Sequence, residues 1–381
     1  MTTIYLIRHA EAEGNLYRRI HGIYDSTITR RGFKQIAALK KRFEDIKIDA
    51  VYSSNLLRTI KTAGAIYLNH KLPLIVSPKL REVDMGAWED RTWGEVERFE
   101  PEQLGNFNNA PDLWKVKGAE DYFSLQKRVT QALVDIAAKH DGETVAVFSH
   151  GQATRAFVAN VLNVPPEEIA RVKHSDNTAV TLLRVQNSEI TVDWYGDNAH
   201  LSEEISTFAH QKWWRENATY DSSNLRFTPF DFKSNAKRYL DYRRDAHQSF
   251  YGKGMAADEN ILALAQAREE AHPRAASLAL IYDTPVGMIE LDTREGMTDK
   301  AGVIEFFYMI PEHRRTGIAV QLLGQAVSVY RTLGREKLRI TLSEKNAQAR
   351  AFCQKYGFET AGVFENQFGK HLILEMGILL Q

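Results

Sequence analysis

Short apolar runs alternate with amphipathic stretches over the first 200 residues, and this alternation constrains the fold more than any other feature of the chain. Runs rich in β-branched and aromatic residues predict strands at 3–8, 50–53, 74–76 and 144–148. Apolar residues at helical spacing predict helices at 31–43 (capped by Thr29), 58–69, 121–139 and 151–161. Strands that alternate with helices form a mainly parallel sheet covered by helices on its faces. We therefore predict a three-layer α/β/α domain, closed by two strands at 177–185 and 189–195.

The second half of the chain has a different pattern. It follows a polar stretch around 197–225 that contains Trp213-Trp214. Strands are predicted at 225–230, 277–283, 286–292, 303–310, 338–342 and 370–379, and helices at 234–249, 258–272, 317–330 and 347–356. Thr284-Pro285, between two strand-like runs, indicates a hairpin. This layout predicts an α+β domain. The expected boundaries are 1–203 for the first domain, 204–224 for a linker or helix, and 225–381 for the second domain.

Composition excludes several classes of protein. The 381 residues carry 49 Lys+Arg and 49 Asp+Glu, so a general polyanion binder such as a DNA-coating protein is not expected. A single cysteine, Cys353, excludes an intramolecular disulfide framework and a Cys-rich zinc site. Neither a signal peptide nor an apolar run of about 18 residues is present, which predicts a cytoplasmic protein with no membrane partner. The sequence does not decide the oligomeric state.

Two arginines and two histidines stand at predicted strand ends. Arg8-His9 close the first strand, His150 follows the strand at 144–148, and Arg58 begins the helix after 50–53. The carboxyl ends of parallel strands form the usual ligand crevice of such a sheet. Guanidinium forks match phosphate oxygens, and a neutral histidine is a nucleophile for phosphorus. A histidine at a strand end is usually structural when taken alone, but the four together predict a phosphate site.

The same residues belong to four blocks that resemble the histidine phosphatase (phosphoglycerate-mutase-like) superfamily, in that family's order. The blocks are Arg8–Glu11 with Asn15, Ser54–Ala63, Leu80–Glu89 and Ser149–Gly151. His21-Gly22 also match, with His21 where relatives often carry Gln. The resemblance implies a phosphoglycerate-mutase-like fold for the first domain.

The resemblance also implies roles for individual residues. His9 would be the nucleophile that becomes phosphohistidine, and Glu82 the general acid. Arg8, Arg58 and His150 would clamp the phosphoryl oxygens. Further contacts to the substrate or its phosphate would come from Asn15, His21, Gly22 and Gly151. No metal is expected, because the family works without one and the sequence shows no cluster of carboxylates that would require one. Glu82 lies in a compact Arg-Glu-x-Asp-x-Gly-x-Trp-Glu block, which favours a phosphatase; a phosphoglycerate-type mutase stays open as the alternative.

A second anion site is predicted between the strand at 303–310 and the helix that follows it. A turn of small residues at a helix N-terminus offers backbone N–H groups and a favourable dipole to phosphate, although a basic helix start explains the turn equally well. The stretch Arg314–Ala319 resembles the acyl-CoA pyrophosphate loop of the GNAT N-acetyltransferase superfamily, and 349–359 resembles that family's "Tyr-x-x-x-Gly-Phe" helix end. The resemblance implies that acetyl-CoA is a cofactor, bound by Arg314, Arg315, Thr316, Gly317, Ile318, Ala319 and Asn346.

One departure concerns the acid of the acetyl transfer. The family's usual tyrosine, four residues before the glycine, is Cys353 here, and Tyr356 stands one residue before Gly357. Both residues are therefore candidates for the acid. Glu305 and Glu290 lie on predicted strands as candidates for the base, and each is also explained by a structural role.

The sequence as a whole predicts a bifunctional enzyme. Its first domain is expected to hydrolyse a small phosphate ester, and its second domain to acetylate a small amine. The alternative for the second domain is a module that binds or senses acyl-CoA without catalysis.

Overall fold

The computed structural model describes residues 1–211, 223–251 and 259–380. Trp213-Trp214 and most of the predicted linker at 204–224 lie outside these residues. Two compact units are present. The first comprises 1–91, 96–211 and 380, and the second comprises 92–95 and 223–379.

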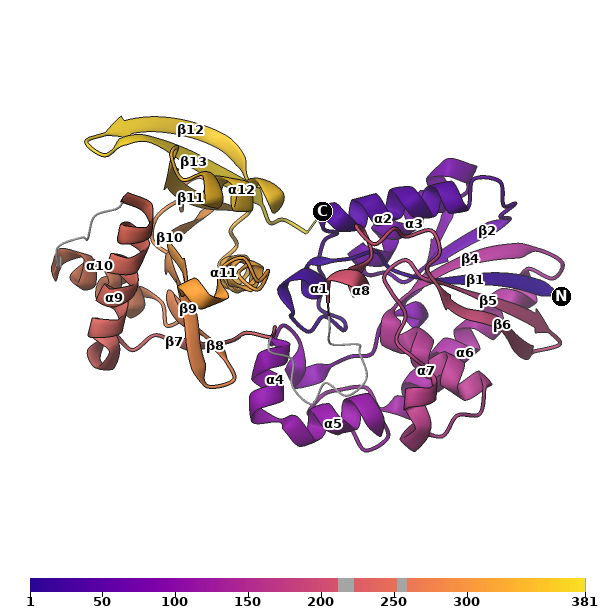
Figure 1. Ribbon diagram of the computed structural model, residues 1–381. Coiled ribbons are helices and arrows are strands. Elements are labelled where there is room, and N and C mark those ends of the chain that lie inside the picture. Colours follow the sequence, from indigo (N-terminus) through magenta and orange to yellow (C-terminus); the bar gives the residue numbers. More distant parts are fainter. Residues whose placement is uncertain (212–222, 252–258, 381) are drawn as a thin grey trace. The chain divides into compact units, whose positions relative to one another are not determined.

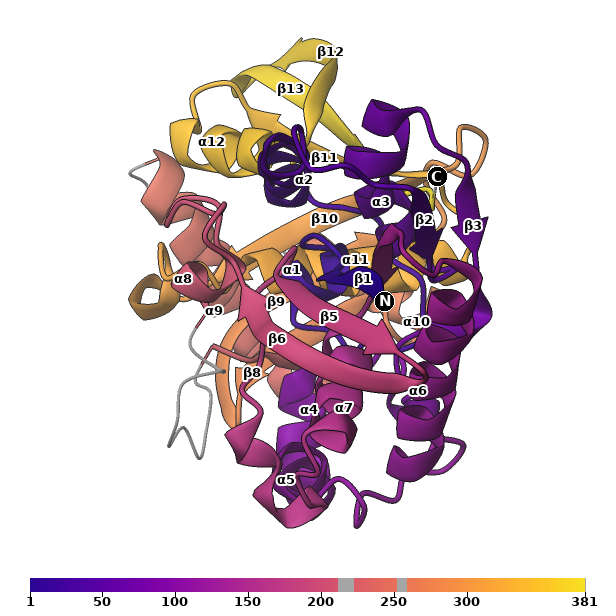
Figure 2. The same cartoon turned by 90° about the vertical axis from the view of Figure 1, so that its right-hand side faces the viewer.

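A six-stranded sheet forms the centre of the first unit, in the order β3-β2-β4-β1-β5-β6. Its strands are β1 (Thr2–Arg8), β2 (Ala50–Ser53), β3 (Leu74–Val76), β4 (Thr144–Ser149), β5 (Val180–Gln186) and β6 (Glu189–Asp197). The first four strands in chain order pair in parallel, and β5 and β6 add an antiparallel edge beside β1 (Figure 2). The predicted, mainly parallel sheet is confirmed.

Helices cover both faces of this sheet. The helices between residues 1 and 211 are α1 (Glu13–Tyr17), α2 (Arg30–Arg42), α3 (Leu57–His70), α4 (Trp93–Phe99), α5 (Pro101–Asn109), α6 (Tyr122–Lys139), α7 (Gly151–Val161) and α8 (Thr207–His210). Helices α2 and α3 lie on one face and α6 and α7 on the other (Figure 1), so the three-layer prediction is confirmed. The predicted cap of α2 is present, since the Thr29 hydroxyl accepts a hydrogen bond of 3.0 Å from the Gly32 N–H. Three short 3₁₀ turns are found at Pro78–Leu80, Gly86–Trp88 and Pro166–Arg171.

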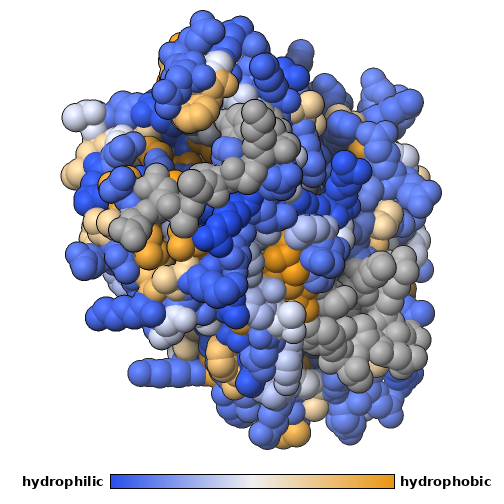
Figure 3. Space-filling view, turned by 60° about the vertical axis from the view of Figure 1, so that its left-hand side comes forward, coloured by the Kyte–Doolittle hydropathy of each residue, from blue (hydrophilic) through white to orange (hydrophobic). Residues whose placement is uncertain are grey.

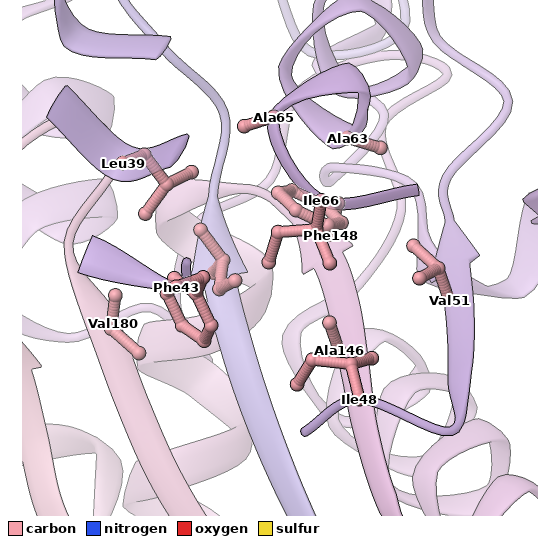
Figure 4. Packing of buried hydrophobic residues seen from close by; sticks show 11 residues of the cluster. Leu39, Phe43, Ile48, Val51, Ala63, Ala65, Ile66, Ala146, Phe148 and Val180 are labelled. Atoms are coloured by element: carbon pink, nitrogen blue, oxygen red, sulfur yellow. The ribbon is translucent and has the colours of Figure 1, made fainter. Parts of the chain in front are cut away.

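The core between the sheet and helices α2 and α3 explains why these helices dock where they do (Figure 4). Phe43, which follows α2, and Ile66 from α3 are fully buried against Ile7 and Phe148, which stand opposite each other on β1 and β4. Alternate residues of a strand face the same side, so Ala146 joins Phe148 on this face. Each fully buried large apolar side chain contributes about 1.5–3 kcal/mol to folding.

The second unit is built on a seven-stranded mixed sheet with the order β12-β13-β11-β10-β9-β8-β7. Its strands are β7 (Arg226–Pro229), β8 (Ala276–Ile281), β9 (Thr284–Asp292), β10 (Ala301–Met309), β11 (Lys337–Ser343), β12 (Glu359–Asn366) and β13 (Gly369–Gly377). Its helices are α9 (Phe232–Tyr251), α10 (Glu259–Ala271), α11 (Val320–Thr332) and α12 (Ala347–Lys355), with a 3₁₀ turn at Pro311–His313. All its strand pairs are antiparallel except β10–β11, so the predicted α+β class is confirmed.

The β8–β9 turn and strand β12 of the second unit differ from the prediction. The β8–β9 hairpin is present, but its turn is Tyr282–Asp283, because Thr284 already pairs with Ile281. Tyr282 adopts a left-handed backbone with φ of 54°, which sequence signals for turns assign to Gly or Asn rather than to Tyr. Strand β12 was not predicted at all; it is exposed along nearly its whole length and therefore lacks an apolar alternation.

The surface seen in Figure 3 is predominantly hydrophilic, with apolar side chains in small groups among polar ones. In the ranges that the structure describes, no helix combines the length and apolar character needed to cross a membrane.

Candidate functional site

The ends of β1 and β4 place two predicted site histidines side by side. Arg8 stands opposite Ser149 in the parallel register, so His9 and His150 both follow at the same edge of the sheet. Their rings are 5.3 Å apart between centroids. The His9 ring also lies 5.7 Å from the His21 ring in an edge-on arrangement. Three of the predicted residues are thus adjacent.

The His9 side chain is buried and held in one tautomer. Its Nδ1 lies 2.8 Å from the carbonyl oxygen of Ala10. A carbonyl only accepts, so Nδ1 carries the hydrogen and Nε2 carries the lone pair. Burial lowers the pKa of His9 well below its ordinary value, and the charges of Arg58 and Arg8 lower it further. His9 is therefore a neutral imidazole with Nε2 available as a nucleophile.

Two buried guanidinium groups flank this histidine. Arg58 is fully buried and donates to the carbonyl oxygens of Gly22 (2.6 Å), His21 (2.9 Å) and Tyr24 (3.2 Å). Burial lowers the pKa of Arg58 to about 10, although the negative charge of Glu82 acts to raise it. Arg8 donates to the carbonyl of Ser175. The Nε atoms of both arginines are buried without a hydrogen-bond partner among the described residues, and donors of this kind suit an anionic ligand.

His150 completes the group of donors. Its Nε2 is joined to the Ser54 hydroxyl oxygen by a hydrogen bond of 2.9 Å. Its Nδ1 is buried and has no partner within the described part of the chain. Burial, followed by the charge of Arg58, lowers the pKa of His150 well below the usual value. His150 is therefore neutral, and Ser54 sets its orientation.

Glu82 lies in the same electrostatic environment, at the N-terminus of α7. Its carboxylate accepts hydrogen bonds from the backbone N–H groups of Ala153 (2.7 Å), Gln152 (3.0 Å) and Val83 (3.0 Å). Its charge acts on both Arg8 and Arg58. The positive end of α7 thus holds this carboxylate beside the two arginines.

The remaining predicted residues shape the surroundings. Burial lowers the pKa of His21 well below its usual value, and its Nδ1 lies 3.0 Å from the Ser26 hydroxyl oxygen. Gly14 makes room for the His21 ring, because a Cβ there would lie 2.3 Å from it. Asn15 accepts from the Ala12 N–H at 3.0 Å. At Gly151 a Cβ would lie 3.2 Å from the Nε atom of Arg8, which leaves little space for a larger residue.

In the second unit, β10 and β11 pair over only part of their length. The parallel ladder runs from Ala301 opposite Lys337 to Ile304 opposite Ile340 and then ends. Beyond it, β10 continues along β9 and β11 continues along β13. Glu305 is the first β10 residue beyond the ladder with β11, so it stands where β10 and β11 part. The register between β10 and β9 also shifts here, between Ile304 and Phe306.

The predicted anion turn lies between β10 and α11, and its residues divide into two groups. Arg315, Thr316 and Gly317 are exposed. Gly317 has φ of 91°, a conformation that favours glycine. Arg314 instead contacts the unit itself: it forms an ion pair with Asp245 and donates to the carbonyl of Met309 at 2.9 Å.

The turn also begins its helix later than predicted. Ala319 is the N-cap residue of α11, which starts at Val320 rather than at Gly317, and Ile318 is buried. The exposed backbone of the turn therefore precedes the helix N-terminus.

The residues of α12 separate the two candidate acids. The Asn346 side chain accepts a hydrogen bond of 3.0 Å from the Ala349 N–H and so caps this helix. Cys353 is buried, and burial raises the pKa of its thiol to about 12. Tyr356 ends the helix with its ring 4.8 Å from that of Phe352. A thiol with so high a pKa is a poor proton donor, which favours Tyr356.

The two candidate bases also differ. Glu290 is fully buried and accepts hydrogen bonds from Arg268 (2.7 Å), Arg243 (2.8 Å) and Tyr239 (2.9 Å), which is a structural role. Glu305 lies 3.1 Å from Arg268, and 28% of its side chain is exposed. Burial raises the pKa of Glu305, which favours its neutral form and makes its carboxylate a stronger base.

Comparison with known proteins decides the family. A family model described as the histidine phosphatase superfamily (branch 1) matches residues 4–198, just over half of the 381-residue chain. The chain belongs to this superfamily. A second model, the acetyltransferase (GNAT) family, matches residues 217–358. The chain therefore joins a histidine phosphatase domain to a GNAT domain.

Individual relatives align with the phosphatase domain. The chain is 31% identical over 205 residues to a metal-independent phosphoserine phosphatase of Arabidopsis thaliana, covering 53% of this chain and 84% of the relative. It is 29% identical over 208 residues to the probable phosphoglycerate mutase GpmB of Proteus mirabilis, covering 53% of this chain and 96% of the relative. Among solved structures it is similar to Bacillus stearothermophilus YhfR, with 30% identity, a TM-score of 0.51, and coverage of 53% of this chain and all of that one.

The candidate site of the histidine phosphatase domain includes residues that sequence reasoning missed. Asn177 was predicted to start a strand, but β5 starts at Val180. Its side-chain amide instead donates to the backbone carbonyl of His9 at 2.9 Å, and the Thr178 N–H donates to the same oxygen at 3.2 Å. The run Ser-Asp-Asn-Thr at 175–178 is typical of a turn, and it could have indicated that Asn177 lies in a loop rather than in a strand. Among the described residues, no group of three or more His, Cys, Asp or Glu side chains is arranged to hold a metal ion.

Proposed function

We propose that the first domain hydrolyses small phosphomonoesters through a phosphohistidine intermediate on His9. The observation that carries the proposal is the state of this side chain. His9 is buried and neutral, its Nδ1 hydrogen is bound to the Ala10 carbonyl, and two buried arginines lie beside it. Positioning and charge neutralisation are the main requirements of phosphoryl transfer.

The first step forms a bond between His9 Nε2 and phosphorus as the phosphorus–oxygen ester bond breaks. Arg8, Arg58 and His150 bind the phosphoryl oxygens, and their unpaired buried nitrogens supply the donors. Glu82, entering this step in its protonated form, gives its proton to the leaving alkoxide oxygen and is left as the carboxylate. In the second step Glu82 takes a proton from water, whose oxygen attacks phosphorus. The nitrogen–phosphorus bond then breaks, its electron pair returns to Nε2, and inorganic phosphate leaves.

The test of this proposal is a phosphate-release screen over phosphorylated metabolites with wild-type protein and single variants. His9→Ala and Arg8→Ala should each lose at least about a thousandfold in kcat/KM, since they remove the nucleophile and one clamp. His371→Ala, in the other unit, is the matched histidine control and should retain wild-type activity. Full activity in both site variants would refute the proposal.

A phosphoglycerate-type mutase is the second candidate, supported by the similarity to the GpmB protein. A mutase returns the phosphoryl group to a second hydroxyl, whereas a phosphatase releases it to water. Incubation with a phosphoglycerate, followed by separation of its isomers and of inorganic phosphate, distinguishes the two. We expect free phosphate to predominate.

We also propose that the second domain transfers an acetyl group from acetyl-CoA to a small amine. The parting of β10 and β11 and the exposed turn at Arg315–Gly317 support this proposal. Backbone N–H groups of Gly317, Ile318 and Ala319 precede α11 and suit a pyrophosphate. Asn346 lies at the start of α12, where its side chain already caps the helix.

When bound, acetyl-CoA supplies the acetyl group. Glu305, at the point where β10 and β11 part, takes a proton from the incoming amine, and Arg268 at 3.1 Å fixes its carboxylate. Tyr356 supplies a proton to the leaving sulfur, in preference to the buried Cys353 thiol.

Calorimetric titration with acetyl-CoA tests the binding step. Gly317→Ala and Gly334→Ala form a matched pair, because both glycines have positive φ and open space where a Cβ would stand. Both variants should lose a similar stability of about 1 kcal/mol, but only Gly317→Ala should bind acetyl-CoA more weakly. Binding without transfer to any amine in a panel would favour the acyl-CoA-sensing alternative.

The two activities together suggest a substrate class. A small phosphate ester that also carries an amino group would suit both domains, and the phosphoserine phosphatase similarity is consistent with such a compound. Screening phosphorylated amines with and without acetyl-CoA tests this. N-acetylation of the dephosphorylated product, or of the phosphate ester itself, is the expected result.

A further inference from the structure

A polar segment of the first unit follows the last strand of the sheet and bonds to the active-site loops. We call residues 198–211 the strap. It contains α8 and overlaps the start of the predicted linker at 204–224. Besides bonds to α2, it contacts two segments next to the site. The first is the 9–15 loop, which carries His9 and runs into the start of α1 at Asn15, and the second is the 175–178 loop, whose backbone and side chains contact Arg8 and His9.

Asp176 is the main link between the strap and the 175–178 loop. Its carboxylate is 2% exposed. One oxygen accepts from the Ser206 hydroxyl at 2.6 Å and from the Asn198 amide at 3.3 Å. The other accepts from the N–H groups of Asn177 at 2.8 Å and Phe208 at 3.3 Å. A buried carboxylate left without such donors is costly, so these bonds fix the strap and the loop to each other.

A second link runs through Thr178. This β-branched residue has a left-handed backbone with φ of 58°, which is strained for its type. Its hydroxyl donates to the carbonyl of Asn177 at 2.7 Å and lies 3.0 Å from His200 Nε2. Arg42 donates to His200 Nδ1 at 3.1 Å, so Nε2 carries the hydrogen that Thr178 accepts. The strap thereby holds the strained residue in place.

The strap also contacts the 9–15 loop directly. The Gln211 amide donates to the backbone carbonyl of Asn15 at 2.9 Å. The Thr207 hydroxyl donates to the buried Glu11 carboxylate at 3.3 Å. Gln35 bridges the two segments, since its amide donates to Thr207 at 3.0 Å and its carbonyl accepts from the Glu11 N–H at 2.7 Å.

We propose that the strap is a positioning element of the phosphatase site, and that the functional domain extends to Gln211. The 175–178 loop orients Arg8 through the Ser175 carbonyl and His9 through Asn177 and Thr178. Release of the strap would free this loop and misplace both Arg8, which binds the phosphoryl group, and the nucleophile His9. A misplacement of about 1 Å is enough to lower a rate about a hundredfold. The inference rests on the proposed phosphatase activity.

Ser206→Ala tests this inference, with Ser202→Ala as its matched control. Both serines are in the strap, but Ser206 is buried and bonds to Asp176, whereas Ser202 is exposed. We expect Ser206→Ala to lower kcat/KM for phosphate release about tenfold, with a parallel weakening of inhibition by inorganic phosphate, the probe for the Arg8 clamp. Ser206→Thr keeps the hydroxyl and should restore most of the loss. Ser202→Ala should match wild type.

The outcomes separate this inference from the proposed function. If wild-type protein releases phosphate and His9→Ala does not, the phosphatase proposal stands whatever the strap variants do. Wild-type kcat/KM and phosphate inhibition in Ser206→Ala would then overturn the role of the strap. A loss that Ser206→Thr fails to restore, or that Ser202→Ala shares, would also overturn it, because neither result depends on the bond to Asp176. If folding of Ser206→Ala is impaired, His200→Leu, which has no side-chain donor, provides a second test through Thr178, with the same expected loss.

Discussion

The Ser54 hydroxyl oxygen lies 2.9 Å from Nε2 of His150, and both side chains are fully buried. Ser54 follows β2 and His150 follows β4, so the bond joins two neighbouring strand ends. With Nε2 engaged in this bond, Nδ1 of His150 is the ring nitrogen that has no hydrogen-bond partner among the described residues.

Ser54→Ala should therefore disturb the orientation of His150 without removing a proposed phosphate ligand. We expect kcat/KM for phosphate release to fall about tenfold, as for the loss of one buried hydrogen bond. Ser54→Thr, which keeps the hydroxyl, should recover part of the activity. Steady-state kinetics with the best ester of the screen measures this. Identical values for wild type and Ser54→Ala would show that the bond does not position His150.

Acid pH should destabilise the first unit. Burial lowers the pKa values of His9, His21 and His150 well below 6.5. As pH falls through about 6.5, the unfolded chain takes up protons at these histidines while the folded unit does not. The free energy of unfolding therefore decreases as the pH falls, by at most about 1.4 kcal/mol per pH unit for each histidine.

Thermal unfolding from about pH 8 to about pH 5 measures this effect. The transition that inorganic phosphate shifts can be assigned to the first unit. His9→Ala should reduce the pH slope. A melting temperature that is independent of pH over this range would contradict the assignment of neutral, buried histidines.

Neighbouring arginines in the turn proposed to bind acyl-CoA should behave differently. Arg315 is exposed, whereas Arg314 is paired with Asp245 and bonded to the Met309 carbonyl. Arg315→Ala should weaken acetyl-CoA binding about threefold to tenfold, more at low salt than at high salt. Arg314→Ala should lower the stability of the second unit by about 1 kcal/mol. Calorimetry and thermal unfolding of both variants test this; equal effects on binding would show that Arg314 also contacts the cofactor.

Cys353→Ala should leave acetyl transfer within about twofold of wild type, because its buried thiol has a pKa raised to about 12 and is a weak acid. Tyr356→Phe should lower kcat much more than KM. The rate of thiol release from acetyl-CoA with an active amine measures both. A hundredfold loss in Cys353→Ala alone would assign the acid to the cysteine.

Much of the geometry of the candidate phosphatase site was predictable from local sequence. Arg8-His9 and His150 follow short apolar runs, and parallel pairing brings such strand ends to one edge of a sheet. The structure shows that pairing, with Arg8 opposite Ser149. Thr29 was also recognisable as a helix cap from its residue type and position.

Other features depend on tertiary contacts and left no local signal. The hairpin turn lies at Tyr282–Asp283 because strand pairing imposes a left-handed tyrosine. Among the described strands, β12 pairs with β13 alone at the sheet edge, and its exposed residues show no alternation. The strap bonds Ser206 to Asp176, which is 30 residues earlier, and no periodicity records such a contact.

The central claim is that His9 carries the phosphoryl group during turnover, and trapping the intermediate tests it most directly. Wild-type protein should be mixed with a radiolabelled phosphomonoester, quenched in alkali within one turnover, and digested for peptide mapping. We predict an acid-labile, alkali-stable label on the peptide that contains His9, with no label in His9→Ala. Phosphate release by His9→Ala at the wild-type rate, or wild-type turnover with no labelled histidine, would contradict the account.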